Sequence, residues 1–238
     1  MFNLKRKKIL FIDHESGHGG SSISLFNKIN LISKNPNYEV SVFLRKRSHL
    51  SQVYKKINVK VYYLNIPTIT SVKTLTSNVI YLIKFFLKFL VFNFKNKNFY
   101  KKLEYYDLIH LNHENLYWLL RKIKTKTKVK LSISIRTILK NNFFSRLQSN
   151  IINDYADKRL FISKINLKNF NDLVDIKKKR NFILENFALA KSKKNNFYSK
   201  KSNKKILKVI SIANFSLDRG VDRIINIAEI FSEKKIKN

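Results

Sequence analysis

Apolar and polar positions follow two different periods along this chain, one typical of strands and one typical of helices. Segments with these two periods alternate. Short apolar runs bounded by charged or turn residues predict buried strands, and apolar residues three and four positions apart predict helices. The predicted strands are 7–13, 38–44, 59–65, the end of 101–112, 129–135, 158–163 and 180–186. The predicted helices are 21–34, 76–94, 115–123, 144–156 and 165–174. Strands that alternate with helices are typical of βαβ units, so we expect an α/β fold with a parallel sheet flanked by helices.

A polar segment without apolar periodicity follows this series at 187–204 and is typical of a linker. A further strand over 205–214 and a helix over 220–231 come after it. One strand and one helix cannot bury a core of their own. We therefore expect a complete first domain over 1–186 and only the first strand and helix of a second Rossmann-like domain over 205–238.

The segment 76–94 is long and apolar, but Lys84 and Lys88 interrupt it. The uncharged stretches on either side are far shorter than the roughly 20 residues that cross a bilayer. The two lysines are four positions apart and share one face of the predicted helix. Two interpretations stay open, a surface helix packed on the sheet and an interfacial helix with its apolar face in lipid and its lysines on anionic head groups.

The chain carries 49 Lys and Arg against 15 Asp and Glu, a net charge of +34. Such a charge predicts attraction to anionic partners, nucleic acid among them. The cations are spread along the whole chain, however, and the abundant Lys, Asn, Ile, Phe and Tyr have codons rich in A and T, while Gly and Pro number 4 and 2. Codon bias with general attraction to anionic surfaces is therefore favoured over dedicated nucleic-acid binding.

Cysteine is absent, which excludes disulfides and thiolate metal ligands. His14, His18, His110 and His113 lack the spacing of a metal site, so no metal is expected. The apolar run near the N-terminus is too short for a signal peptide, and we expect an intracellular protein.

Three of the four glycines, Gly17, Gly19 and Gly20, lie between the first predicted strand and the first predicted helix. Glycine lets a backbone approach an anion closely, and the free N–H groups at a helix N-terminus favour negative charge. Ser21 and Ser22 are candidate N-caps for the helix. This segment therefore predicts an anion-binding turn.

The same turn approaches the glycine pattern of a dinucleotide-binding loop. A site for NAD also needs an acidic residue at the end of the second strand, and the chain has Arg45, Lys46 and Arg47 there. Basic residues at this place suit a 2′-phosphate, so an NADP-binding oxidoreductase or epimerase stays open as an alternative. A basic protein that binds RNA or an anionic membrane is the other.

Five stretches, in their order and spacing, resemble GT-B glycosyltransferases of family GT4. They are KILFIDHESGHGGSSISLFNKI (8–29), YDLIHLNHEN (106–115), ADKRLFISK (156–164), ILENF (183–187) and ISIANFSLDRGVDRIINIAEIF (210–231). The last stretch resembles the opening of the donor-binding domain of that family. The resemblance spans nearly the whole chain and implies a GT-B fold.

The resemblance also implies an activity and its partners. These are sugar transfer with retention from a nucleotide-diphospho-sugar, without a metal or other cofactor, to a glycan or lipid-linked acceptor in cell-envelope polysaccharide or glycolipid synthesis. It implies a cytoplasmic setting, with peripheral contact at the inner face of an anionic membrane. It assigns His110 to catalysis, or His113 if the loop is shifted by one residue, and Gly19, Gly20, Ser21, Asn214 and Arg219 to the donor phosphates. Asn112 falls on the acceptor side, where we also place His14, which borders the glycine turn, and Arg136, which follows a predicted strand at the same edge of the sheet.

The chain departs from the family pattern in three places. Ala213 and Asn214 stand where the family has Gly-Arg, and Phe187 replaces a glycine. The region with two glutamates that hold the donor sugar has no counterpart within the 238 residues. We therefore expect the chain to be inactive alone, and three explanations stay open: a truncated reading frame, one half of a split gene whose C-terminal half is encoded separately, or a remnant.

Overall fold

The computed structural model describes residues 6–15, 19–68, 75–96, 98–175 and 180–185, and positions 223, 225–227, 229 and 230. The chain divides into two compact units, Met1–Ala190 and Lys191–Asn238. The described positions of the second unit are helical, as predicted for 220–231. The predicted linker over 187–204 and the predicted strand over 205–214 lie outside the described residues.

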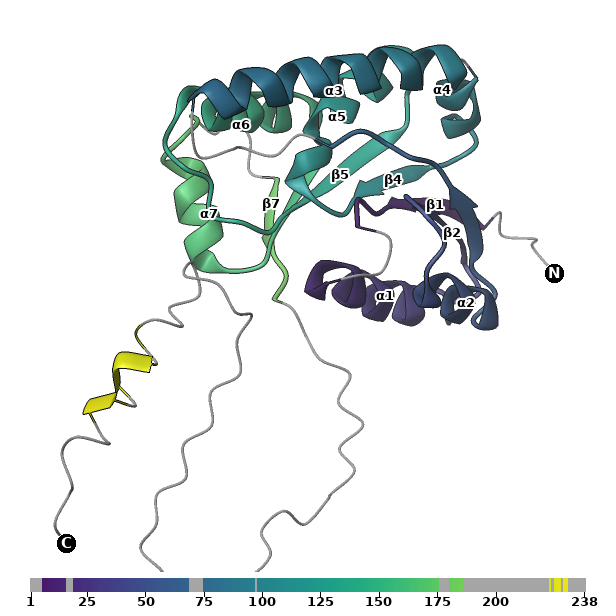
Figure 1. Cartoon of the computed structure of the whole chain (residues 1–238). Helices are drawn as coiled ribbons and strands as arrows, with labels where there is room; N and C mark the ends of the chain where they lie inside the picture. Colours follow the sequence, from purple (N-terminus) through teal and green to yellow (C-terminus); the bar gives the residue numbers. More distant parts are fainter. Residues whose placement is uncertain are drawn as a thin grey trace, which may run out of the picture. The chain divides into compact units, whose positions relative to one another are not determined.

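The first unit is built on a parallel sheet of seven strands in the order β3-β2-β1-β4-β5-β6-β7 (Figure 1). The strands are β1 (Lys7–Ile12), β2 (Tyr38–Leu44), β3 (Lys60–Tyr63), β4 (Leu108–Leu111), β5 (Lys130–Ile135), β6 (Lys158–Phe161) and β7 (Asn181–Ile183). Every neighbouring pair is parallel. The chain builds outward from β1 to β3 and then crosses back to β4, so the strand order reverses between β1 and β4. Ligands of open α/β sheets bind at the carboxyl edge beside such a reversal.

The seven predicted strands and five predicted helices are all present. The helices are α1 (Gly20–Ile32), α2 (His49–Lys56), α3 (Leu75–Lys95), α4 (Phe99–Leu103), α5 (Tyr117–Lys126), α6 (Phe143–Tyr155) and α7 (Lys164–Asn171), with a 3₁₀ turn η1 (Glu114–Leu116) before α5. The sequence did not predict α2 and α4. Both are short, with eight and five residues.

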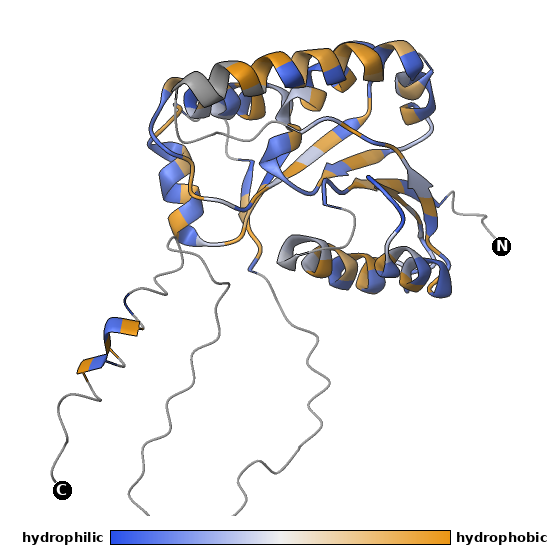
Figure 2. Cartoon of the chain, in the orientation of Figure 1, coloured by the Kyte–Doolittle hydropathy of each residue, from blue (hydrophilic) through white to orange (hydrophobic). Residues whose placement is uncertain are grey.

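Successive residues of each strand point to opposite faces of the sheet, and each face has its own core. Helices α1 and α2 cover one face, where Phe11 and Val42 pack with Leu25 and Tyr54. The larger core on the other face joins Leu10, Ile109 and Ile133 to residues of α4–α7. Figure 2 shows the apolar strands between these two helical layers.

Helix α3 forms the outer layer of the larger core and packs on α5. The rings of Phe85, Phe89 and Phe92 surround Trp118 with centroid distances of 5.9, 5.2 and 5.9 Å. The indole N–H of Trp118 donates to the carbonyl of Pro67 at 2.9 Å. Among the described residues, none of the helices has the length and apolar content to cross a bilayer.

The buried hydroxyl of Tyr54 leads to a first testable prediction. Within the part of the chain that the structure describes, this hydroxyl has no hydrogen-bond partner, although the ring packs on Phe26 at 5.4 Å. Tyr54→Phe removes a desolvated polar group and keeps the ring. We expect the free energy of unfolding in urea to rise by up to about 1 kcal/mol.

The matched control is Tyr63→Phe, because the Tyr63 side chain on β3 is 37% exposed and its hydroxyl is hydrated in both states. We expect no change there. A loss of stability in Tyr54→Phe alone would show that the buried hydroxyl makes a stabilising bond, contrary to this account.

Candidate functional site

Polar residues follow three adjacent strands at the carboxyl edge of the sheet. Asp13 and His14 follow β1, Asn112, His113 and Glu114 follow β4, and Arg136 and Thr137 follow β5. The pairing of β1 with β4 and of β4 with β5 places these strand ends side by side. We call these residues, with the first turn of α1, the carboxyl-edge site.

The carboxylate of Asp13 is the centre of this site and is 2% exposed. Its Oδ2 accepts the hydroxyl proton of Ser22 at 2.6 Å, and its Oδ1 accepts the side-chain amide of Asn112 at 3.0 Å. Burial raises the pKa of Asp13, but the nearby His14 and the hydrogen bonds from Ser22 and Asn112 together outweigh burial and hold the pKa below its ordinary value. Asp13 is therefore ionised at neutral pH and ties β1, α1 and β4 together.

The glycine turn leads directly into α1. The helix begins at Gly20, and Gly19 is its N-cap with a φ of 100°, so the prediction of Ser21 or Ser22 as the N-cap was wrong. Both serines lie inside the first turn, where their hydroxyls reach carboxylates of the preceding loop. Gly17 and His18 lie outside the described residues.

A carboxylate lies beside the N-terminus of α1. The hydroxyl of Ser21 donates to Glu15 Oε2 at 2.8 Å. A Cβ added to Gly19 would lie 2.7 Å from the same oxygen, which the flexible Glu15 side chain can move away, so the φ of 100° is what favours glycine here. The positive end of the α1 dipole thus has an anionic group next to it, as expected for a helix N-terminus.

Two histidine rings are in contact at the centre of the site, tilted by 44°. The rings of His14 and His113 have centroids 4.1 Å apart. Nδ1 of His113 accepts the backbone N–H of Asn115 at 3.2 Å, so this histidine caps η1. Burial lowers the pKa of His113 to about 3, with His14 and Arg136 contributing positive charge.

The tautomer of His113 follows from these contacts. At neutral pH the ring carries one proton, and Nδ1 is occupied as an acceptor. The proton therefore sits on Nε2. Within the described residues no hydrogen bond to Nε2 is formed, which leaves this N–H for a ligand.

His14 lies between two carboxylates. Its Nε2 is 3.4 Å from Glu15 Oε1, and its Nδ1 is 3.7 Å from Asp13 Oδ1. The distance at Nδ1 is too long for a hydrogen bond, and the described part of the chain supplies no other partner for this buried atom.

His110 lies inside the sheet, where its side chain is 3% exposed. Its Nδ1 is 2.9 Å from the hydroxyl of Ser132, and its Nε2 is 3.0 Å from that of Ser134. Burial lowers the pKa of His110 to about 3, with the charges of Lys28 and Arg136 adding to the effect. Both nitrogens are thus engaged within the protein, so this geometry favours a structural role over the predicted catalytic one.

Arg136 is bound to the end of β4. Its Nε donates to the carbonyl of Asn112 at 2.8 Å, and a terminal nitrogen donates to Asn112 Oδ1 at 2.7 Å. These bonds orient the Asn112 amide toward Asp13. Arg136 therefore contributes its charge to the site from a fixed position.

Glu114 is 1% exposed and joins the ends of β4 and β5. Its carboxylate accepts the backbone N–H of Arg136 at 2.9 Å and the hydroxyl of Thr137. Burial raises the pKa of Glu114 despite these hydrogen bonds. Its backbone carbonyl accepts the side-chain amide of Gln148 on α6 at 2.8 Å.

Lys28 reaches toward the site from the inner face of α1. It is 9% exposed. Burial lowers its pKa to about 8, and the charge of Arg136 adds to this shift.

Asp13, Glu114 and Lys28 are site residues that sequence reasoning did not select. The available signals were an acidic residue directly after the first strand and a lysine among the apolar positions of the first helix.

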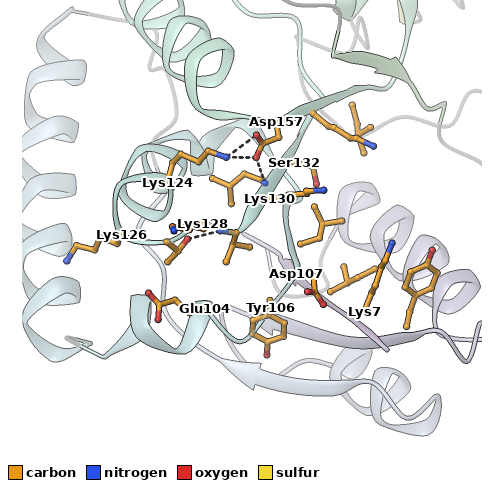
Figure 3. Close-up of a pocket in the computed structure, with 18 of the residues that line it drawn as sticks. Lys7, Glu104, Tyr106, Asp107, Lys124, Lys126, Lys128, Lys130, Ser132 and Asp157 are labelled. Carbon is orange, nitrogen blue, oxygen red and sulfur yellow. Dashed lines mark hydrogen bonds and ion pairs between the residues drawn. The ribbon is translucent and has the colours of Figure 1, made fainter. Parts of the chain in front are cut away.

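A large lysine-rich pocket lies at the opposite, amino edge of the sheet (Figure 3). It has a volume of about 1300 Å³ and is lined by the starts of β1, β4, β5 and β6. Lys124 donates to both carboxylate oxygens of Asp157 there, at 2.9 and 2.7 Å. Because it lies at the other ends of the strands, this pocket is separate from the carboxyl-edge site.

The remaining predicted residues divide into two groups. Gly19, Gly20, Ser21, His14, Asn112, His113 and Arg136 lie in or beside the carboxyl-edge site. Asn214 and Arg219, predicted to contact the donor, lie outside the described residues. Within the described residues, no group of three or more His, Asp or Glu side chains is placed to hold a metal ion.

Comparisons with known proteins give structural matches only. No protein-family model matches the chain, and no curated protein matches it. The fold is similar to Alr3699/HepE from Anabaena in complex with UDP and glucose, at 15% identity over 77% of this chain and 45% of that one, with a TM-score of 0.53. The complex of the same protein with UDP-glucose matches with a TM-score of 0.52, 16% identity, and 76% and 44% coverage.

Sucrose-phosphate synthase from Thermosynechococcus elongatus matches at 15% identity over 76% of this chain and 48% of that one. Its TM-score of 0.47 is too low to support an argument. At these identities the likenesses show the fold alone, a Rossmann-like α/β unit with a parallel sheet flanked by helices. The chain spans less than half the length of the Anabaena protein.

The glycine turn makes a second prediction. Gly19→Ala places a Cβ against Glu15 and forces a side-chain-bearing residue to a φ of 100°, so we expect a loss of about 1–3 kcal/mol in the free energy of unfolding. Gly20→Ala is the matched control, because its Cβ would meet no atom within 4 Å and the residue is helical. Urea titrations that show equal effects for the two variants would contradict the required turn geometry.

The buried histidines make a third prediction, on pH. His110 and His113 stay neutral in the folded chain down to a pH of about 3, whereas unfolded histidine takes up a proton near pH 6.5. Their contribution to stability is therefore complete above about pH 6.5 and is lost as the pH falls toward 3. Each histidine contributes a slope of about 1.4 kcal/mol per pH unit in that window.

His110→Gln removes one titrating group, so the pH dependence of unfolding should become shallower by that amount. His49→Gln, at the exposed start of α2, serves as the control and should leave the slope unchanged. If His110→Gln does not fold, His113→Gln tests the same point. Unchanged slopes in both buried-site variants would contradict the assignment.

Proposed function

We propose that the chain forms the acceptor-side part of a glycosyltransferase that uses a nucleotide-diphospho-sugar donor. The observation that carries the proposal is the carboxyl-edge site, where a glycine turn, a helix N-terminus, a free imidazole N–H and a fixed arginine meet beside the strand-order reversal. The sequence motifs that resemble family GT4, and the likeness of the fold to a protein solved with UDP-glucose, support it.

The chemistry of the transfer accounts for the types of residue present. The leaving nucleotide diphosphate gains negative charge as its bond to the sugar breaks, so cations and helix N–H groups near it lower the barrier. Gly19, Gly20 and Ser21 present the N-terminus of α1 to this charge. Lys28 and Arg136 add positive potential from fixed places behind it.

His113 acts in this proposal as a hydrogen-bond donor. Because its pKa is about 3, it is neutral at pH 7 and has no second proton to give as an acid. Its Nε2–H is suited to a hydroxyl of the transferred sugar or the acceptor. His14 and Asn112 lie beside it and complete the acceptor side.

The finer features of the reaction follow the family resemblance. We propose transfer with retention, without a metal, in the synthesis of cell-envelope polysaccharide or glycolipid at the cytoplasmic face of a membrane. Turnover requires a donor-binding domain in addition to residues 6–185. Asn214 and Arg219 begin that domain in this proposal, and the same or a separate polypeptide supplies the rest.

An assay of the chain combined with such a donor domain tests the function. With UDP-glucose and a polyprenyl-phosphate-linked acceptor, we expect release of UDP. His113→Ala should lower kcat/KM by about tenfold or more, since a hydrogen bond to a sugar hydroxyl contributes about 1–3 kcal/mol. His113→Gln, which keeps an N–H donor, should retain more activity than His113→Ala.

Equal activity of the two variants would show that His113 does not donate a hydrogen bond to the sugar or the acceptor. Tight binding of NADP⁺ to the chain, with no effect of UDP-glucose, would instead favour the dehydrogenase or epimerase alternative. For that alternative the structure places Arg45 and Arg47 just beyond the carboxyl end of β2, with Arg45 bonded to Asn65 at 2.9 Å.

The carboxylate of Glu15 makes a separate prediction. It lies where the donor phosphates approach, and like charges repel, so its side chain, 39% exposed, must turn toward solvent. Glu15→Gln keeps a partner for Ser21 and removes the charge. We expect UDP affinity, measured by calorimetry, to rise about two- to fivefold. A lower affinity would show that Glu15 itself holds the ligand.

A further inference from the structure

Helix α3 has a second apolar face that points away from the protein, which we call the outer face of α3. Its members are Ile80, Ile83, Phe86, Leu87, Leu90, Val91 and Phe94, with exposures from 48% to 74%. At about 100° per residue, these positions fall within an arc of about 140°. They lie opposite Phe85, Phe89 and Phe92, which hold the helix on Trp118. Figure 2 shows apolar residues along this helix.

Cations border the outer face on one side. Lys84, Lys88 and Lys95 are exposed and occupy the adjacent arc of the helix, between the outer face and the packed face. Residues 75–95 contain no acidic residue. The outer face is therefore apolar with a one-sided cationic border.

The neighbouring helix supplies further cations on the other side of the outer face. A groove of about 540 Å³ runs between α3 and α5, with Phe85, Phe86 and Phe89 among its walls and Arg121 and Lys122 beside it. The ammonium group of Lys122 lies 5.4 Å from the centre of the Phe89 ring. Aromatic walls next to cations suit an apolar chain that ends in a phosphate.

Soluble monomers seldom leave a contiguous apolar patch of this extent exposed, so the outer face has the character of an interaction surface. The net charge of the chain distinguishes between a second copy of the chain and a bilayer as the partner. A second copy would bring together two chains that each carry +34, and they would repel. An anionic bilayer attracts the lysine border and takes up the apolar side chains.

We propose that the outer face of α3 docks on an anionic lipid bilayer. The helix lies in the plane of the interface, as its length and two lysines within the apolar run require. Its apolar residues enter the lipid, and Lys84, Lys88, Arg121 and Lys122 meet the head-group phosphates. This docking does not depend on the glycosyltransferase proposal, and its test uses no enzymatic readout.

Flotation of the full chain with vesicles tests the proposal. One set of vesicles is phosphatidylcholine alone, and the other is phosphatidylcholine and phosphatidylglycerol in equal parts. We expect binding to the anionic vesicles that weakens with added salt. Lys84→Gln with Lys88→Gln should weaken it about 30-fold, from the contribution of two lysines near a charged surface.

The apolar part has its own variant, Leu87→Asn with Phe94→Asn, which should also reduce binding strongly. Both side chains are already exposed, so the fold should persist, and the thermal unfolding midpoint checks this. The matched controls are Ile165→Asn, 66% exposed on α7, and Lys55→Gln with Lys56→Gln on α2. The controls should bind like the unmodified chain.

Three outcomes would overturn the proposal. The first is no binding to anionic vesicles. The second is an equal loss in the α2 lysine control, which would show attraction by overall charge without the outer face. The third is a stable dimer in light scattering that Leu87→Asn with Phe94→Asn dissociates, which would assign the face to a second copy.

Discussion

The ionised carboxylate of Asp13 is the interaction on which the site depends. It is almost fully buried and accepts hydrogen bonds from Ser22 on α1 and from Asn112 after β4. A buried charge is stable only when such partners are present, so the two elements are held at fixed places relative to β1. The N-terminus of α1, the histidine pair and Arg136 are thereby brought to one edge of the sheet. This carboxylate thus fixes the glycine turn relative to the strand ends, in addition to the packing of Leu25 and Ile29 of α1 on the sheet.

Charges of both signs are fixed around this centre. The ionised carboxylate of Asp13 lies in the same site as the cations Lys28 and Arg136, and burial keeps His110 and His113 neutral. The site therefore offers fixed cations and neutral hydrogen-bond donors beside a carboxylate that other protein groups already bind. This arrangement suits a substrate that carries phosphate. The outer face of α3 lies in another layer of the molecule, so contact with a membrane and contact with a donor would involve separate surfaces of the same domain.

Much of the fold could be predicted because strands and helices have different apolar periods, and all seven strands and five of the seven helices of the first unit followed from them. Helices α2 and α4, of eight and five residues, were not predicted, because a period is hard to recognise over so few residues. At the site, glycine spacing located the turn, but not the cap, because the spacing does not show which glycine adopts the positive φ of the N-cap. The sequence alone does not distinguish the role of His110 from that of His113. Only the pleat of β4 shows that one points between two serines and the other lies beyond the strand end.

A double-mutant cycle in Ser22 and Asn112 tests the central claim most directly. Each residue bonds a different oxygen of Asp13, so Ser22→Ala and Asn112→Ala remove separate bonds to one buried charge. Free energies of unfolding from urea titrations give the coupling between the two residues. We predict a coupling of about 0.5–3 kcal/mol, as for residues of one hydrogen-bond network. Effects that add to within about 0.3 kcal/mol would contradict the account, because α1 and β4 would then be held independently of Asp13.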